Sequence, residues 1–382
     1  MPNANMQRQP DRPTWIEIDG DALINNLQQI RSIIGPRPQL CAVVKANAYG
    51  HDAALVASIA ARNGADRFAV AATSEGFALR HAGIDAPILV LGYTPARLAS
   101  TAITHRLALA VYDLENALAL NDAARSAGAT LTVHVKINTG MNRLGVNAAE
   151  GLGFFTALQG MSNLVVEGIF THFASSDLLD KASAYAQFSA FELLLDELSR
   201  AGMRPPIAHA ANSAAILTMP ETHLDMVRAG ITIYGLDPDV DETPLPDGFQ
   251  PVMSWKTEVA QVRRLSPGDG VSYGHEFVAD REMVAAVIPV GYADGFPRRP
   301  LTWESVLIRG RSAAILGRVC MDQAIVDVTP IVDDSGAMAV GEEVILIGRQ
   351  GDAELSADEA GRRTCTINYD VLSRILARVP RV

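Results

Sequence analysis

The chain has 382 residues, a length that predicts two domains, or one large domain with an addition. Hydrophobic residues make up 48% and charged residues 20%, so a sizeable core can form and disorder is not expected. The net charge of −11 argues against a nucleic-acid partner, because such a partner requires clustered Lys and Arg.

The cysteines and the first residues indicate the compartment. Cys41, Cys320 and Cys365 are widely spaced and odd in number, which predicts neither a disulfide framework nor a metal site and favours a reducing, cytoplasmic environment. Residues 1–13 are polar, so we expect a flexible leader rather than a secretory signal. No apolar run approaches the ~20 residues of a membrane span, and we expect no membrane partner.

Residues 14–243 alternate between short β-branched runs and Ala- and Leu-rich stretches of helical spacing. The predicted strands are 40–44, 67–71, 87–92, 107–112, 131–137, 165–172, 207–210 and 226–235. Eight strands joined by helices predict a (β/α)8 TIM-like barrel. A doubly wound open sheet is the alternative, but no G-x-G-x-x-G follows any of these strands.

The texture changes after the Pro- and Asp-rich linker at residues 236–251. Short β-rich segments separated by turns follow it, and helical periodicity is scarce until residues 368–379. Residues 244–382 are therefore predicted to form a second, mostly β domain.

The carboxyl ends of barrel strands are where active sites form. The predicted strand ends carry, in chain order, Lys45 with Tyr49 and His51, Lys136 with Arg143, His172, Asn212 with Ser213, and Arg228 with Gly230. Each has a purely structural explanation: a strand-end lysine reaches water, an asparagine caps a helix, a histidine is hydrogen-bonded in the core, and arginines form surface ion pairs. What argues for function is that several strands deliver such groups to one rim.

This set of side chains suits an anionic ligand. Barrels often bind phosphate in the loops after strands seven and eight, where Ser213 and Gly230 lie. A lysine beside such a site suggests a phosphate-bearing aldehyde held as a Schiff base, and pyridoxal 5'-phosphate fits that description.

The motifs resemble those of alanine racemases, and they do so in the same order along nearly the whole chain. The matching stretches are "AVVKANAYGH", "KINTGMNRLG", "THFASSD", "ANSAA", "VRAGITIYG", "VSYGHEF", "PVGYADGF", "GRVCMDQ" and "CTINYDVLSRI". The resemblance implies a pyridoxal-phosphate enzyme of fold type III, with a barrel followed by a β domain. It also implies interconversion of L-alanine and D-alanine for peptidoglycan synthesis.

The resemblance also implies residue roles. Lys45 would hold the cofactor and act as one base, and Tyr273 would act as the opposite base from the other subunit of a homodimer. Arg228 would face the pyridine nitrogen with His172 bonded behind it, and Arg143 would contact the phenolic oxygen and the substrate carboxylate. The remaining residues are, around the phosphate, Tyr49, Asn212, Ser213, Gly230, Ile231 and Tyr369, and, on the substrate side from the partner subunit, Tyr292 and Met321.

Two positions depart from the family pattern. Asp52 replaces a usual glycine, and Asn138 stands where an aspartate is expected. Lys136 matches a lysine that is carbamylated in some members, where it orients the arginine at Arg143.

Three other readings stay open from the sequence. They are a broader-specificity racemase acting on serine or basic amino acids, a related amino-acid decarboxylase, and a non-catalytic pyridoxal-phosphate carrier. A decarboxylase needs an acidic partner for the pyridine nitrogen, so Arg228 argues against it, and the domain that carries Tyr273 argues against a carrier built on a barrel alone.

Overall fold

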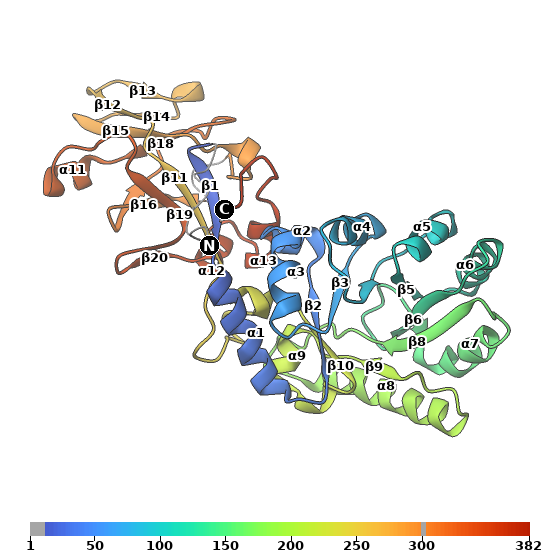
Figure 1. Ribbon diagram of the computed structural model, residues 1–382. Coiled ribbons are helices and arrows are strands. Elements are labelled where there is room, and N and C mark those ends of the chain that lie inside the picture. Colours follow the sequence, from blue (N-terminus) through green and yellow to red (C-terminus); the bar gives the residue numbers. More distant parts are fainter. Residues whose placement is uncertain (1–11, 299–302) are drawn as a thin grey trace, which may run out of the picture. The chain divides into compact units, whose positions relative to one another are not determined.

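The computed structural model describes residues 12–298 and 303–382, so most of the expected leader, residues 1–11, lies outside the described residues. The chain divides into two compact units (Figure 1). One comprises Gly20–Gln250, and the other comprises Pro251–Val382 together with the amino-terminal residues up to Asp19.

The unit formed by Gly20–Gln250 is a nearly closed parallel barrel, which confirms the predicted fold class. Its strands are β2 (Gln39–Val43), β3 (Arg67–Val70), β4 (Ile88–Val90), β5 (Leu107–Val111), β6 (Leu131–Asn138), β8 (Leu164–Phe170), β9 (Ile207–His209) and β10 (Met226–Ala229). The order is β10-β2-β3-β4-β5-β6-β8-β9, with the short β7 (Val146–Asn147) beside β6. Hydrogen bonds from Asp225 N to Ala208 O and from Arg228 N to Ala211 O, at 3.1 and 3.0 Å, link β10 to β9.

Hydrophobic runs produce these strands because a barrel strand is covered on both faces. All five residues of β5, "LALAV", are buried. The surrounding helices are α1 (Gly20–Ile34), α3 (Ala53–Arg62), α4 (Thr73–His81), α5 (Ala99–Thr104), α6 (Leu114–Ser126), α7 (Gly151–Leu158), α8 (Ala182–Arg200) and α9 (Ser213–Thr218). Helix α8 buries Phe188, Phe191, Leu195 and Leu198, the three- and four-residue spacing of one helical face. Among the described helices, none has the length and apolar character to cross a membrane.

Three predicted boundaries differ in the structure. The expected strand 226–235 ends at Ala229, and a 3₁₀ turn, η4 (Ile231–Tyr234), follows it. Strand β6 continues to Asn138, so Lys136 lies within the strand rather than at its end. Residues 14–18, expected in the barrel domain, form β1 (Thr14–Ile18), which pairs with β11 (Met253–Glu258) of the other unit.

The other unit is mostly β, as predicted. One sheet has the order β1-β11-β19-β16-β17, with β20 beside β19, and a second has the order β12-β15-β18. The strands are β12 (Gln261–Leu265), β15 (Met283–Ile288), β16 (Ser305–Ile308), β17 (Arg311–Ala314), β18 (Ala324–Asp327), β19 (Glu343–Gln350) and β20 (Ala353–Leu355). The strands β13 (Gly270–Val271) and β14 (Phe277–Val278) form a small hairpin. The described α-helices of this unit are α11 (Thr329–Ser335), α12 (Ala357–Arg363) and α13 (Asn368–Ser373). Trp255, Phe296 and Trp303 pack together in its core, with ring centroids 4.8 to 6.0 Å apart.

Candidate active site at the carboxyl end of the barrel

Lys45 follows β2 and begins a left-handed turn, α2 (Lys45–Tyr49). Ala46, Asn47 and Ala48 have φ angles of 52°, 53° and 56°, and Tyr49 has 54°. Such a conformation costs roughly 1–2 kcal/mol for a residue other than glycine, asparagine or aspartate, so Ala46, Ala48 and Tyr49 together store on the order of 3–6 kcal/mol. Strain of this kind persists only where surrounding contacts hold it, and it is concentrated at functional sites.

Two side chains hold the strained turn. The Glu75 carboxylate, from α4, accepts from Ala46 N at 2.7 Å, and its second oxygen accepts from the N–H groups of residues 71 and 72 at 2.7 and 3.1 Å. The Asn47 side chain accepts from Ala53 N at 2.9 Å. The position of Lys45 therefore depends on contacts with the two helices that follow it.

Asp52, which the sequence leaves unexplained, caps helix α3. Its Oδ1 accepts from Ala54 N and Leu55 N at 3.0 and 3.1 Å, and its φ is 75°. A glycine adopts that φ without strain, whereas aspartate offsets the strain by supplying the cap.

Four basic side chains converge at the carboxyl ends of the strands. Burial lowers the pKa of His172 most, and the charges of Arg228, Lys136, Arg143 and Lys45 lower it further. Burial is also the main reason that the pKa of Lys45 is lowered, followed by the charge of Arg143. Because like charges repel, such a cluster favours an anionic ligand.

Lys136 is 7% exposed, and burial, with the nearby charges of Arg228 and Arg143, lowers its pKa to about 6. Its Nζ lies 5.1 Å from the centre of the Phe170 ring. No carboxylate contributes to this shift, so burial and the two arginines together favour the neutral amine.

Arg228 on β10 is 4% exposed, and burial lowers its pKa to about 10. Its Nη1 donates to His209 Nδ1 and His209 O at 2.9 and 3.1 Å. Its Nη2 donates to Thr171 O, Ala210 O and His172 Nδ1 at 2.8, 2.9 and 3.2 Å. These neutral acceptors hold the guanidinium plane and leave its charge uncompensated.

Ser213, Gly230 and Tyr49 lie close together where β10 ends. Ser213 Oγ accepts from Gly230 N at 2.9 Å and lies 3.1 Å from Thr232 Oγ1. A Cβ at position 230 would lie 2.8 Å from Tyr49 Oη, so only glycine leaves this approach open. Ile231 begins η4 directly after it.

Asn212 is the N-cap of α9, because its Oδ1 accepts from Ala215 N at 3.1 Å. The same oxygen accepts from Ser176 Oγ at 2.8 Å. The structural explanation, a helix cap, therefore accounts for this oxygen.

Asn138 organises the loop that carries the exposed Arg143. Its Oδ1 accepts from Gly140 N and Asn142 N at 3.2 and 2.9 Å. Its Nδ2 donates to Asn142 Oδ1 and Asn147 Oδ1 at 2.9 and 3.2 Å. An aspartate could accept the first pair of bonds but could not donate the second.

The mostly β unit brings its predicted residues together on its own surface. Tyr273, Tyr292 and Met321 are 67%, 39% and 52% exposed. Ser272 Oγ lies 3.4 Å from Cys320 Sγ, and the N–H groups of Tyr292 and the next residue donate to Cys320 O and Met321 O at 3.2 and 3.0 Å. Residues far apart in the sequence thus form one exposed cluster. Tyr369 lies in α13, half-buried, in the same unit.

Sequence reasoning missed two residues that support the site, Glu75 and His209. Glu75 lies in the first turn of a helix, a position that suggests only a favourable charge there. His209 is the penultimate residue of the predicted strand 207–210, three residues upstream of "NSAAIL", and could have been included with the other strand-end residues.

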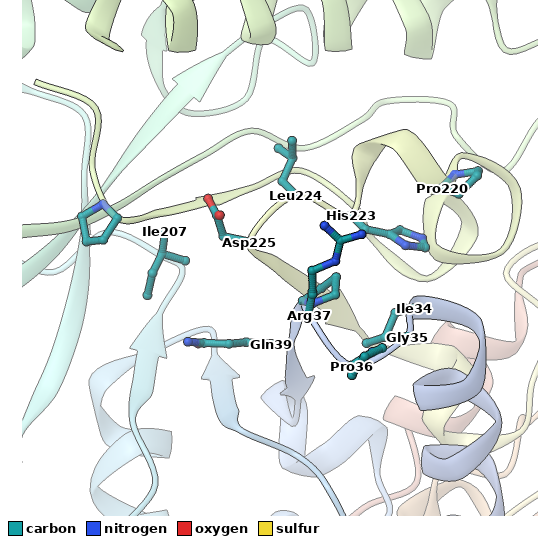
Figure 2. A pocket seen from close by; sticks show the side chains of 12 residues that line it. Ile34, Gly35, Pro36, Arg37, Gln39, Ile207, Pro220, His223, Leu224 and Asp225 are labelled. Carbon is teal, nitrogen blue, oxygen red and sulfur yellow. The ribbon is translucent and has the colours of Figure 1, made fainter. Parts of the chain in front are cut away.

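A hollow of about 660 Å³ lies at the opposite, amino end of the barrel (Figure 2). Gln39 and Ile207, the first residues of β2 and β9, line it together with Arg37, His223 and Asp225. Barrel active sites form at the carboxyl ends, so we place the candidate site there and not in this hollow.

Comparisons with known proteins agree over both units. Residues 18–238 match the family model "Alanine racemase, N-terminal domain" and residues 252–382 match "Alanine racemase, C-terminal domain". The alanine racemase of Desulfovibrio desulfuricans is 45% identical over 97% of this chain and 98% of its own length. The solved alanine racemase of Clostridium difficile is 38% identical with a TM-score of 0.90, covering 98% of this chain and 96% of its own. That of Bacillus anthracis, solved with bound L-Ala-P, is 39% identical with a TM-score of 0.90, covering 97% and 95%.

Proposed function

Because the chain belongs to the alanine racemase family, we propose that it interconverts L-alanine and D-alanine with pyridoxal 5'-phosphate as its cofactor. The observation that carries the proposal is the convergence of Lys45, Lys136, Arg143 and Arg228 at the carboxyl end of one barrel. The proposed role is the supply of D-alanine for peptidoglycan synthesis in the cytoplasm.

The residues of the barrel fit the cofactor. The buried charge of Arg228 and the open approach at Gly230 suit an anionic group with an aromatic ring. Ser213, Tyr49 and the backbone at Gly230 and Ile231 would hold the phosphate, together with Asn212 and with Tyr369 from the β unit. The bound cofactor would supply the electron sink that makes the substrate's Cα proton removable.

Racemisation needs a proton acceptor on each face of the substrate, and Lys45 and Tyr273 fill these roles. Burial and the charge of Arg143 lower the pKa of Lys45, which brings the amine closer to working as a base near neutral pH. In each direction one residue takes the Cα proton and the other returns a proton to the opposite face. Arg143 would bind the substrate carboxylate and the phenolic oxygen.

Arg228 would face the pyridine nitrogen. An arginine stays protonated even with its pKa lowered to about 10, so it cannot accept a proton and offers only hydrogen-bond donors. The pyridine nitrogen of the bound cofactor would therefore stay unprotonated. His172, whose Nδ1 accepts from Arg228 at 3.2 Å, helps to fix the guanidinium.

We further propose that Lys136 is carbamylated. A neutral amine attacks CO2 through its lone pair and loses one proton, and the lowered pKa of Lys136 supplies that form at neutral pH. The product is an anion beside two arginines, which would compensate part of their charge and orient Arg143. Intact mass measured without acid should exceed the sequence mass by one CO2, and the K136A variant should lack the increment. An unmodified wild-type mass contradicts this assignment.

The active enzyme is proposed to be a homodimer in which Tyr273, Tyr292 and Met321 enter the partner's site. Their joint exposure on one surface supports this arrangement. The test mixes two inactive variants, K45A and Y273F, after unfolding and refolding them together. Each mixed dimer then holds one intact site, so the mixture should recover about a quarter of wild-type activity. If Tyr273 acts on its own subunit's Lys45, the mixture stays inactive.

The activity itself is tested by chiral product analysis of L-alanine with and without pyridoxal phosphate. Wild type should convert L-alanine into equal amounts of both enantiomers, and K45A should form no D-alanine. The bulk of Tyr273, Tyr369 and Met321 predicts a small substrate pocket, so alanine should turn over faster than serine or lysine. Equal rates for the three would indicate the broader-specificity alternative.

A further inference from the structure

A chain of hydrogen bonds runs from Arg228 through the barrel interior to its far end. His209 Nε2 lies 2.9 Å from His134 Nδ1, and His134 Nε2 lies 3.0 Å from Glu167 Oε2. Arg67 donates to both oxygens of Glu167, at 2.8 and 2.9 Å. Arg67 is the first residue of β3, whereas His209 is the last of β9, so the chain connects the two ends of the barrel.

The barrel is shaped to admit this chain. His134 on β6 is opposite Gly168 on β8, and a Cβ at position 168 would clash with the imidazole. Phe170 stacks on His209 with ring centroids 4.9 Å apart and planes 5° from parallel. Both imidazoles are at most 1% exposed, so protein groups and not bulk water determine where their protons lie.

Only one arrangement of protons satisfies every bond. A guanidinium can only donate, so His209 Nδ1 must be an acceptor and its proton lies on Nε2. That proton points at His134 Nδ1, which must therefore accept, so the proton of His134 lies on Nε2. His134 Nε2–H then donates to Glu167, an ionised carboxylate whose pKa the hydrogen bonds from His134 and Arg67 lower to about 2.

We propose that His134 and Glu167 are positioning residues that act through His209 to hold Arg228 as a donor at the cofactor. The carboxylate accepts only, so it excludes the reversed tautomers, in which His209 Nδ1–H would oppose an N–H of Arg228. This inference rests on the proposed function, because the arginine matters to catalysis only if it faces the pyridine nitrogen. The aligned bonds also raise the acceptor strength of His209 Nδ1 and lessen the charge that Arg228 presents.

The decisive substitution is Glu167→Gln. Glu167 Oε2 accepts from both Arg67 and His134, whereas a glutamine can place either its oxygen or its NH2 at that position. The oxygen keeps the original tautomers and the NH2 favours the reversed ones, so His134 and His209 are no longer held to a single tautomer. Glu167→Asp keeps the charge and should restore the original tautomers.

Glu342→Gln is a matched control in the other unit. Arg309 holds Glu342 through two bonds, at 2.7 and 2.6 Å, as Arg67 holds Glu167. The side chains of that pair are 28% and 21% exposed, against 15% and 27% for Arg67 and Glu167. The same chemical change is thus made at an ion pair with no histidine chain.

The first readout is ¹⁵N NMR of the histidine rings in the cofactor-free full-length protein. Wild type, E167D and E342Q should show neutral His134 and His209 protonated on Nε2 alone, and E167Q should show a mixture of Nε2 and Nδ1 protonation on both rings. If E167Q does not fold, His134→Gln replaces it, and His209 should then lose its single tautomer. Wild-type His209 protonated on Nδ1, or unchanged tautomers in the variant, overturns the proposal.

The second readout is the kinetics of the loaded enzyme. In E167Q, kcat should fall about tenfold while KM for alanine changes less than about twofold, as for a supporting residue behind a catalytic one. E342Q should match wild type, and an equal loss in E342Q overturns the proposal. A wild-type protein that does not racemise alanine refutes the proposed function alone, since the NMR result does not depend on turnover.

Discussion

Replacing Glu75 with alanine should both destabilise the barrel and misplace Lys45. The carboxylate accepts three backbone N–H groups, those of Ala46, Ala71 and Ala72, at 2.7, 2.7 and 3.1 Å. All three bonds are at exposed positions, where water screens the carboxylate, so each contributes at the low end for a protein hydrogen bond, about 0.5–1 kcal/mol. The free energy of unfolding should therefore fall by about 1.5–3 kcal/mol.

The effect on turnover should be larger than the stability loss suggests. Without Glu75 the strained turn after Lys45 relaxes toward ordinary backbone angles, and a shift of about 1 Å in a reacting group can cost 10²-fold in rate. The assay is urea unfolding, with barrel and β unit followed separately, alongside kcat for L-alanine. E75Q, which keeps one acceptor oxygen, should be intermediate.

The control for this experiment is Glu115→Ala, which removes an exposed glutamate from the first turn of α6. It should change the free energy of unfolding by less than about 0.5 kcal/mol. If E75A behaves like E115A in both stability and kcat, the carboxylate does not hold the turn and the reasoning fails.

Three further predictions concern groups near the site. Between about pH 6, the folded pKa of Lys136, and the ~10.4 of an unfolded lysine, the unfolded chain binds more protons, so the free energy of unfolding in CO2-free buffer should rise with pH. K136M should remove the contribution of Lys136 to this rise, and denaturation at several pH values measures the free energy of unfolding for both proteins. The same pH dependence in K136M and wild type would mean that Lys136 is charged in the folded protein. Ala46→Gly should stabilise the barrel by about 0.5–1 kcal/mol, because glycine adopts the φ of 52° found at Ala46 without strain. Calorimetry that shows a less stable variant would count against backbone strain at this position. Gly230→Ala should weaken pyridoxal-phosphate binding about tenfold or more by displacing Tyr49. Gly153→Ala, a control in open space on α7, should leave that affinity unchanged. Fluorescence titration compares the two variants, and equal affinities would exclude the steric argument.

The barrel could be predicted because its signals are local. Runs such as "LALAV" and the helices between them follow from hydrophobic period and glycine stops, and all eight predicted strands occur. No strand was predicted at residues 14–18, which were placed in the barrel domain, because the partner of β1, β11, lies far away in sequence and no local pattern identifies it. The overlong strand 226–235 is rich in β-branched residues on both sides of Gly230, yet β10 ends at Ala229 and Ile231–Tyr234 form a 3₁₀ turn.

The candidate site could be predicted where a side chain carries charge at a strand end, as for Lys45 and Arg228. It could not be predicted where the role depends on a partner from another element. Glu75 reaches the turn from a neighbouring helix, and His134 and Glu167 acquire meaning only beside His209. Asp52 is a similar case, since its cap exists only because the preceding turn is left-handed.

The pairing of β1 with β11 also constrains the order in which the protein can fold during synthesis. Thr14 and Thr257, whose hydroxyls lie 2.8 Å apart, are separated by 243 positions. At 5–20 residues per second, roughly 12–50 s pass between the synthesis of the first strand and that of its partner. The barrel sequence is completely synthesised within that interval, and β1 has no strand partner until β11 is made. Among the described strands, the first to be synthesised therefore cannot pair with β11 until the barrel sequence is complete.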